Sequence, residues 1–109
     1  MVYKVHKSAS AEQDMFAILD YLTENLSSPS AARRFYYSLL ACYERLRLNP
    51  FIYQLCRDEE LSARGFRCAP VMRYLVFYTT DEKRKFVKVH RIIHGTMDYS
   101  KMDFPSSPL

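Results

Sequence analysis

The residues best suited to chemistry are histidines, arginines and tyrosines in the second half of the chain. His94 precedes Gly95, and because an imidazole titrates near neutral pH it is the best candidate for taking up or releasing a proton. Arg67 and Arg73 carry planar, forked donors that suit a phosphate oxyanion. Tyr99 could stack on a nucleic-acid base or donate a proton. This set predicts an acid–base site that also holds an anion.

A second set of residues makes one part of the chain strongly basic. Between Arg64 and His94 there are eight lysines and arginines against two acidic residues, whereas the whole protein has a net charge of +4. A basic surface attracts nucleic acid or an acidic protein. We therefore expect contacts with a target from Arg91, Lys88, His90, Lys83, Arg84 and Lys85.

Each candidate also has a structural explanation that needs no ligand. His94 could hydrogen-bond to backbone at a strand end, and Arg91 could pair with an acid such as Asp98. Most tyrosines could be half-buried packing residues, and the run 83–85 could be a solvated turn. Residue types alone do not choose between these explanations.

The composition is that of one folded domain. From the 109 residues we expect a single domain over 1–103 and a flexible tail, rich in proline and serine, over 104–109. No apolar run approaches the ~20 residues of a membrane span, and the N-terminus lacks the apolar core of a secretory signal. We expect a cytoplasmic protein with no membrane partner. The two glycines cannot form a glycine-rich phosphate loop, and we expect no metal or cofactor.

The three cysteines, Cys42, Cys56 and Cys68, are odd in number and widely spaced. We expect them to form neither a disulfide framework nor a C-x-x-C metal pair. Cys42 lies in an apolar helical pattern and is expected in the core. Cations near Cys68 could lower the pKa of its thiol, but no partner histidine is evident for a nucleophilic role.

A β-hairpin is expected to position the candidate residues. Two runs of β-branched and aromatic residues, 71–79 and 85–94, are joined by the polar turn 80–84, which is typical of an antiparallel hairpin. We expect one face of the hairpin to pack on helices and the other to be free to bind. Strand alternation places Val87, Val89, Arg91 and Ile93 on one side, and Lys88, His90, Ile92 and His94 on the other.

Two amphipathic helices are predicted before the hairpin. The first covers residues 11–26, and either Ser8 or Ser10 can cap it. Ser28 and Pro29 begin the second, which ends near Leu48. The short connection between them predicts an antiparallel helical hairpin.

The remaining elements complete an α+β fold. Residues 2–7 form a short first strand, and 51–63 a loop with one helical turn at most. A further strand begins over 65–69 and is interrupted or bulged at Pro70, which cannot donate to a ladder. We expect an N-terminal strand and a helical hairpin packed on a three- to four-stranded, mainly antiparallel sheet.

Several short strings follow one another along nearly the whole chain: Ser10-Ala11 with Asp14 and Tyr21, Leu46 to Pro50, Gly65-Phe66-Arg67, Arg73 to Tyr78, and Arg91 to Gly95 followed by Asp98. In this order they resemble the RelE/ParE superfamily of small bacterial toxins. The ParE-like branch commonly ends its last strand with R-x-x-H-G followed by R-D; Met97 stands here in place of that arginine.

The resemblance implies the toxin of a type II toxin–antitoxin module, an addiction or plasmid-stabilisation system that arrests growth. It implies an antitoxin partner, for which we expect an acidic, amphipathic C-terminal segment. ParE-like members poison DNA gyrase, and the strings favour this branch slightly. RelE-like members cleave mRNA on the ribosome without a metal. A basic RNA-binding module without toxicity is a third alternative.

The two main alternatives need different residues. Metal-free RNA cleavage requires a base for the 2′-OH proton, cations for the charge on phosphorus and an acid for the leaving oxygen. His94, Arg73, Arg67 and Tyr99 would supply these groups. Inhibition of gyrase requires a binding surface and no chemistry.

Overall fold

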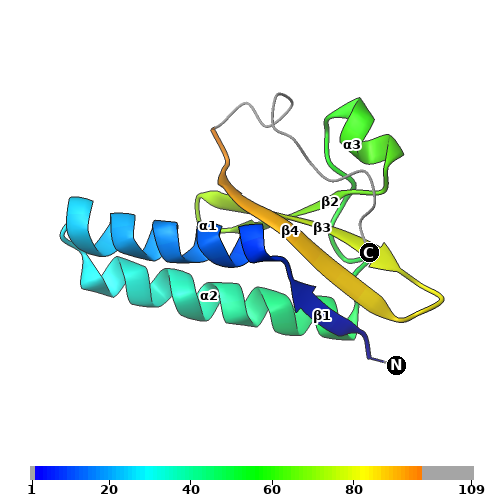
Figure 1. The fold of residues 1–109 in the computed structure, drawn as a ribbon, viewed down its shortest axis with the longest axis horizontal. Coiled ribbons are helices and arrows are strands. Elements are labelled where there is room, and N and C mark those ends of the chain that lie inside the picture. The colour runs from blue at the N-terminus through cyan, green and yellow to red at the C-terminus, as the bar shows by residue number, and fades with distance from the viewer. Residues whose placement is uncertain (1, 97–109) are drawn as a thin grey trace.

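The computed structural model describes residues 2–96, in which a four-stranded sheet packs against two long helices (Figure 1). The sheet order is β1-β4-β3-β2, with β1 parallel to β4 and the other pairs antiparallel. The expected α+β fold is confirmed. The expected tail over 104–109 and Tyr99 lie outside the described residues. The elements are β1 (Lys4–Lys7), α1 (Ala9–Asp20), η1 (Tyr21–Asn25), α2 (Pro29–Leu48), α3 (Glu59–Ala63), β2 (Arg67–Val71), β3 (Tyr74–Asp81) and β4 (Phe86–His94).

The helical hairpin begins and ends at local signals. The Ser8 hydroxyl accepts the Ala11 N–H at 3.1 Å, so Ser8 caps α1 and Ser10 lies inside the helix. The last helical turn widens into the π-helix η1, where the Leu26 N–H reaches the Tyr21 carbonyl at 3.2 Å. The helix α2 has Ser28 as its cap and Pro29 in its first turn, as expected. Both predicted helices are therefore present.

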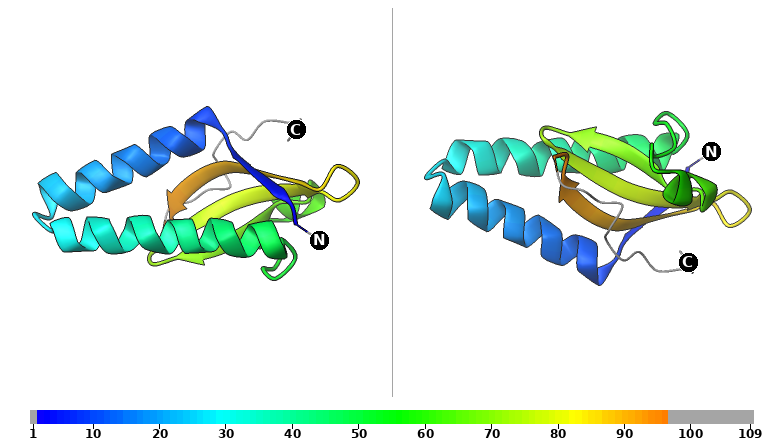
Figure 2. Two further views of the ribbon diagram at one scale, coloured as in Figure 1. Left: turned by 90° about the horizontal axis from the view of Figure 1, so that it is seen from below. Right: turned by 90° about the horizontal axis from the view of Figure 1, so that it is seen from above.

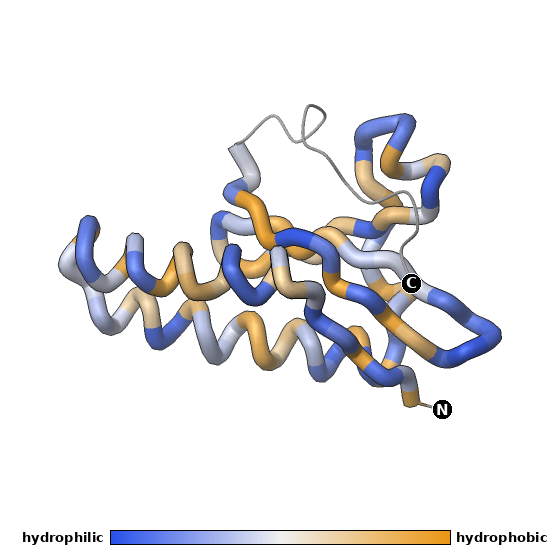
Figure 3. Tube along the Cα trace, viewed as in Figure 1, coloured by the Kyte–Doolittle hydropathy of each residue, from blue (hydrophilic) through white to orange (hydrophobic). Residues whose placement is uncertain are grey.

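The helices lie on one face of the sheet, and the β3–β4 turn extends beyond them at one end (Figure 2). Phe35, Leu39 and Leu46 on α2 are fully buried, because the apolar stripe of that helix faces the sheet. On the strands, Val87 and Val89 belong to the same cluster. By contrast, the β3–β4 turn, at one end of the sheet, is hydrophilic throughout (Figure 3).

The expected alternation in β4 holds only up to Val89. Tyr78 pairs with Val89 but Phe77 pairs with Arg91, so His90 is an extra residue and forms a β-bulge. The bulge reverses the faces beyond it: Ile92 joins the helix-facing cluster, and Ile93 joins a second cluster. The predicted sides of Ile92 and Ile93 were therefore wrong, because a bulge shifts the period of two by one residue.

The second cluster covers part of the face that we expected to be free. It consists of Cys56, Leu61, Phe66, Phe77 and Ile93. Leu61 comes from α3, the single helical turn expected in the loop, which Asp58 caps by accepting the Leu61 N–H at 3.0 Å. Figure 1 shows α3 on the side of the sheet away from α2.

The predicted strand 71–79 is divided by a tight turn. Val71 ends β2 and Tyr74 begins β3, with Met72 in the left-handed region at φ 56°. The sequence carries no glycine or asparagine to mark this turn. The β2–β3 register also continues through Pro70, which pairs with Leu75, so the expected interruption was wrong. Pro70 is exposed on an edge strand, where a missing N–H is tolerated.

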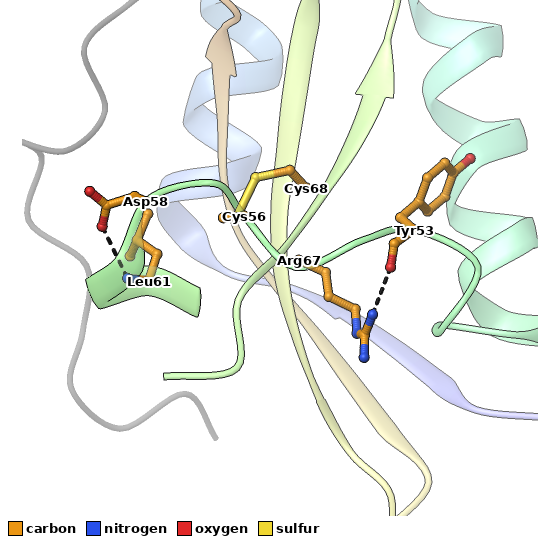
Figure 4. Close-up of a disulfide and its surroundings, with 6 residues drawn as sticks. All are labelled: Tyr53, Cys56, Asp58, Leu61, Arg67 and Cys68. Carbon is orange, nitrogen blue, oxygen red and sulfur yellow. Dashed lines mark hydrogen bonds between the residues drawn. A yellow bond between two sulfur atoms is a disulfide. The ribbon is translucent and has the colours of Figure 1, made fainter. Parts of the chain in front are cut away.

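Cys56 and Cys68 form a disulfide, which corrects our expectation that the cysteines would not pair (Figure 4). Backbone hydrogen bonds hold the two segments together: the Cys56 N–H donates to the Phe66 carbonyl, and the Cys68 N–H donates to the Gln54 carbonyl. The two Cα atoms therefore lie 5.3 Å apart. The disulfide therefore joins the loop before α3 to the edge strand β2. Cys42 is fully buried in the helix-facing core, as expected.

Residues 2–96 offer neither a membrane-spanning helix nor a cluster of metal ligands. None of their helices is long and apolar enough to cross a membrane. Their histidines, cysteines and acidic residues form no group of three that could hold a metal ion.

Candidate functional site

A cleft of about 770 Å³ lies between the helical hairpin and one end of the sheet; we call it the groove. Its apolar wall comes from α1, from η1 and from Leu26, which follows η1. The opposite wall comes from the start of β3 and the end of β4. The groove is lined by Asp14, Ala17, Ile18, Tyr21, Leu22, Leu26, Ala31, Arg34, Met72, Arg73, Tyr74, Arg91, Ile92, Ile93 and His94.

The charged residues that line the groove are mainly cationic. Arg34, Arg73 and Arg91 line it, and Asp14 is its one acidic lining residue. The Asp14 carboxylate binds Arg91 with two hydrogen bonds, which leaves Arg34 and Arg73 without an ion pair among the described residues. An apolar floor between free guanidinium groups suits an amphipathic segment with carboxylates along its edges.

His94 and Arg73 are brought together by a close backbone contact. The Gly95 N–H donates to the Arg73 carbonyl at 2.8 Å, and a Cβ on Gly95 would lie 3.3 Å from that oxygen. Glycine thus permits the last residues of β4 to approach the Met72–Arg73 turn. As a result, both candidate side chains line one end of the groove.

One nitrogen of His94 is already engaged. The Thr96 N–H donates to Nδ1 at 3.2 Å, and the Thr96 hydroxyl lies 2.7 Å from the same atom. Because a backbone N–H can only donate, Nδ1 is an acceptor and the proton of the neutral ring is on Nε2. The ring packs edge-on against Tyr74, with 5.3 Å between the ring centroids. Only Nε2 is left to contact a ligand.

Arg67 lies away from this pair. It pairs with Tyr78 in the middle of β3, whereas the groove is at Tyr74. Its Nη1 donates to the Tyr53 carbonyl at 2.7 Å (Figure 4), and its guanidinium lies 5.1 Å from the centre of the Phe51 ring. The predicted catalytic set is therefore divided: Arg73 and His94 are together, and Arg67 holds a loop. Tyr99 is outside the described residues.

His90, expected to contact a target, is buried on the face of the sheet that carries the second cluster. Its Nε2 lies 2.8 Å from the Thr79 hydroxyl, and its ring centroid is 4.7 Å from that of Phe66. Desolvation by burial, with the charges of Lys88 and Arg64, lowers its pKa to about 4. His90 is therefore neutral near pH 7 and packs like an apolar residue.

The other expected target contacts lie far along the hairpin from the groove. Lys83, Arg84 and Lys85 form the β3–β4 turn, which joins the opposite ends of the strands that reach the groove. The Arg84 N–H donates to Asp81 at 3.1 Å, as in a solvated turn. Lys88 is half-buried on β4. Of this set, only Arg91 lines the groove.

Arg91 pairs with Asp14 on α1. The expected partner Asp98 lies outside the described residues. The Arg91 Nε is 2.7 Å from the Asp14 carboxylate, and this hydrogen bond raises the pKa of the guanidinium further. We did not predict Asp14, Arg34 or Met72 as site residues. Asp14 lies on the polar side of an amphipathic helix. No local sequence pattern indicates that it contacts Arg91, which is 77 residues away in the chain.

Comparisons with known proteins agree with the fold. A family model described as the ParE toxin of a type II toxin–antitoxin system, parDE, matches residues 5–99. A search of curated proteins gives no match. Solved structures are also similar, among them two from toxin–antitoxin systems. One, a chromosomal ParDE toxin–antitoxin system from P. aeruginosa, has a TM-score of 0.67 and 15% identity, over 85% of this chain and 96% of that one. The other, the RelBE2 toxin–antitoxin complex from Mycobacterium tuberculosis, has a TM-score of 0.62 and 19% identity, over 86% of this chain and 99% of that one.

Proposed function

Because the chain belongs to the ParE toxin family of type II toxin–antitoxin systems, we propose that it arrests growth by binding and inhibiting DNA gyrase. An antitoxin that fills the groove holds it inactive. The proposal places the protein in the cytoplasm, where gyrase acts.

The dispersal of the candidate catalytic residues supports inhibition over cleavage. Arg67 donates to a loop carbonyl away from the groove, and one nitrogen of His94 is occupied by Thr96. RNA cleavage needs a base, an acid and a phosphate clamp around one atom. Of the predicted catalytic residues that the structure describes, only Arg73 and His94 line the groove. A surface that only binds does not need such convergence.

The groove indicates the chemistry of the antitoxin. Ile18, Tyr21 and Leu22 offer apolar positions one helical turn apart, which suits an amphipathic helix that presents apolar residues every three or four positions. Arg34 and Arg73 would then pair with carboxylates on the flanks of that helix. We therefore expect an antitoxin with an acidic, amphipathic C-terminal segment, encoded beside this gene in a plasmid-stabilising module.

One observation favours a second candidate, ribosome-dependent cleavage of mRNA. Arg73 and the free Nε2 of His94 share the end of the groove, where a phosphate could be held beside a proton donor. The third candidate, a non-toxic RNA-binding module, depends on the basic turn 83–85, in which Lys83 and Arg84 are exposed.

Two assays on the purified wild-type protein separate these functions. Supercoiling by purified gyrase should be blocked in proportion to added protein, and an mRNA in a translating extract should remain intact. Addition of the antitoxin should restore supercoiling, which controls for non-specific effects of a basic protein. Intact supercoiling together with cleaved mRNA would replace the proposal by the second candidate, and inactivity in both assays would exclude a toxin.

A further inference from the structure

The outer face of α2 carries apolar side chains that nothing in the described structure covers. Tyr37 is 63% exposed, Leu40 42% and Tyr36 38%, and Met72 of the adjoining turn is 48% exposed. The solvent face of an amphipathic helix is normally charged or polar. We call Arg33, Tyr36, Tyr37, Leu40 and Met72 the α2 surface.

The α2 surface has the composition of a protein interface. Tyrosine, methionine and arginine are enriched where proteins meet, and tyrosine and arginine commonly dominate the binding energy. Tyr37, Met72 and Arg33 line a shallow hollow of about 460 Å³, together with Arg34 and two serines. The hollow can receive a side chain of a partner.

The charge of this surface indicates the partner. Arg33 and Arg34 are exposed and have no ion-pair partner among residues 2–96. The first acidic residue of α2 is Glu44, three turns along the helix, and Arg47 binds its carboxylate at 2.6 Å. A second copy of this chain would bring like charges together, whereas an acidic segment would be attracted.

We propose that the α2 surface docks an acidic segment of the protein that the toxin inhibits. Carboxylates of that segment pair with Arg33 and Arg34, and an apolar side chain enters the hollow beside Tyr37 and Met72. This inference rests on the proposed function, because a toxin that only binds must hold its target by a surface.

The position of the surface also explains how an antitoxin could block the target. Arg34 and Met72 line the groove as well as the hollow, so the two binding regions adjoin. An antitoxin helix in the groove would engage Arg34 and crowd Met72. Target and antitoxin would then compete without sharing most of their contacts.

The test uses Arg33→Glu and Tyr37→Ser, separately and together, with Leu48→Ser as the matched control. Leu48 lies on the same helix, is 55% exposed and is outside both the hollow and the groove. Each variant is assayed for growth arrest on induction, for affinity to purified gyrase, for affinity to the antitoxin and for its melting temperature.

We expect the α2 surface variants to lose growth arrest and to bind gyrase at least ~10-fold more weakly, the effect typical of a truncated interface anchor. Antitoxin affinity should change by less than ~3-fold, because Arg34 and the groove are intact. Leu48→Ser should behave as wild type. If Tyr37→Ser lowers the melting temperature, Arg33→Glu alone decides the result, because its side chain is exposed.

The outcomes distinguish failure of the α2 surface from failure of gyrase as the target. Variants that still arrest growth and bind gyrase would overturn the α2 surface and leave the proposed function intact. A wild-type protein that arrests growth without touching gyrase would overturn that target; the α2 surface would then stand only if its variants no longer arrest growth. A Tyr37-dependent dimer, or a loss of RNA binding in place of gyrase binding, would assign the surface to another occupant and overturn the inference.

Discussion

Asp14 on α1 binds Arg91 on β4 through both oxygens of its carboxylate. The Nε of Arg91 lies 2.7 Å from Oδ2, and Nη2 lies 3.0 Å from Oδ1. The same carboxylate accepts the backbone N–H of Ile92 at 2.9 Å. The Arg91 side chain is only 25% exposed and the Asp14 side chain only 17%. One acidic residue therefore joins the two walls of the groove and accepts a backbone N–H of β4 beyond the last residue of that strand that pairs with β1.

Removal of this carboxylate should be costly. Asp14→Ala should lower the free energy of unfolding by about 2–3 kcal/mol, because it leaves a half-buried guanidinium and a backbone N–H unsatisfied. Asp20→Ala, at the exposed end of the same helix, should stay within about 0.5 kcal/mol of wild type. Urea denaturation measures both, and equal stabilities would show that the pair contributes little.

The disulfide should be detectable and stabilising. In the unreduced, denatured protein, only Cys42 should react with an alkylating reagent; after reduction all three cysteines should react. Because the bond closes a loop with a sequence separation of 12, Cys68→Ser should lose about 2–4 kcal/mol. A reductant should destabilise the wild type by a similar amount and leave Cys68→Ser unchanged. Three reactive cysteines before reduction would refute the bond.

The burial of His90 should make stability depend on pH. Unfolded chains protonate histidine below about pH 6.5, whereas the folded protein excludes this proton down to about pH 4. Between these values the unfolded state binds more protons, so stability falls as the pH falls. The loss should approach about 3 kcal/mol near pH 4. His90→Gln should remove this part of the dependence in unfolding experiments at pH 7, 5.5 and 4, whereas His94→Gln should retain it.

The core can be tested with two adjacent leucines. Leu39 is fully buried and Leu40 is 42% exposed. Leu39→Ala should cost about 2–5 kcal/mol through lost burial and a cavity between α2 and the sheet. Leu40→Ala should cost less than about 1 kcal/mol, since it leaves no cavity. Equal melting temperatures for the two variants would mean that the helix is rotated relative to the sheet.

The end of the groove separates binding from catalysis. If the protein inhibits gyrase, His94→Gln should weaken the block of supercoiling by less than ~10-fold, as for one contact in a large interface. If it cleaves mRNA, His94→Gln should lower the rate by ~10²–10⁴ and Arg73→Ala by ~10²–10³. A melting temperature close to that of the wild type confirms that both variants are folded.

Elements with local signals were predicted best. Ser28, Pro29 and Asn49 mark the ends of α2 in the sequence, and its bounds agree with the structure. The turn at Met72 was missed because its left-handed backbone occurs at a residue that gives no such signal. The bulge at His90 arises from the pairing of two strands, so alternation within one strand could not reveal it.

The site was predicted in part, for the same reason. The pairing of Tyr74 with His94 brings Arg73 and His94 together, and the predicted hairpin already implied that they lie near one another. The groove itself needs α1 and β4 to be adjacent, which depends on the parallel pairing of β1 with β4. The disulfide similarly depends on a loop that returns to the edge strand. Contacts between residues far apart in the chain produce no regular spacing of residue types, so the sequence pattern does not reveal them.

The parallel pairing of the first strand with the last has a consequence for the timing of folding during synthesis. Lys4 pairs with Phe86, and the Ser8 hydroxyl donates to the His90 carbonyl 82 residues later. Contacts over such separations form slowly, and translation at about 5–20 residues per second delays β4 by several seconds after β1. Since α1 and β4 supply opposite walls of the groove, a nascent chain has no groove until β4 has emerged from the ribosome. Under the proposed function, the newly made protein would become competent to bind its antitoxin only after β4 has been made and has paired with β1.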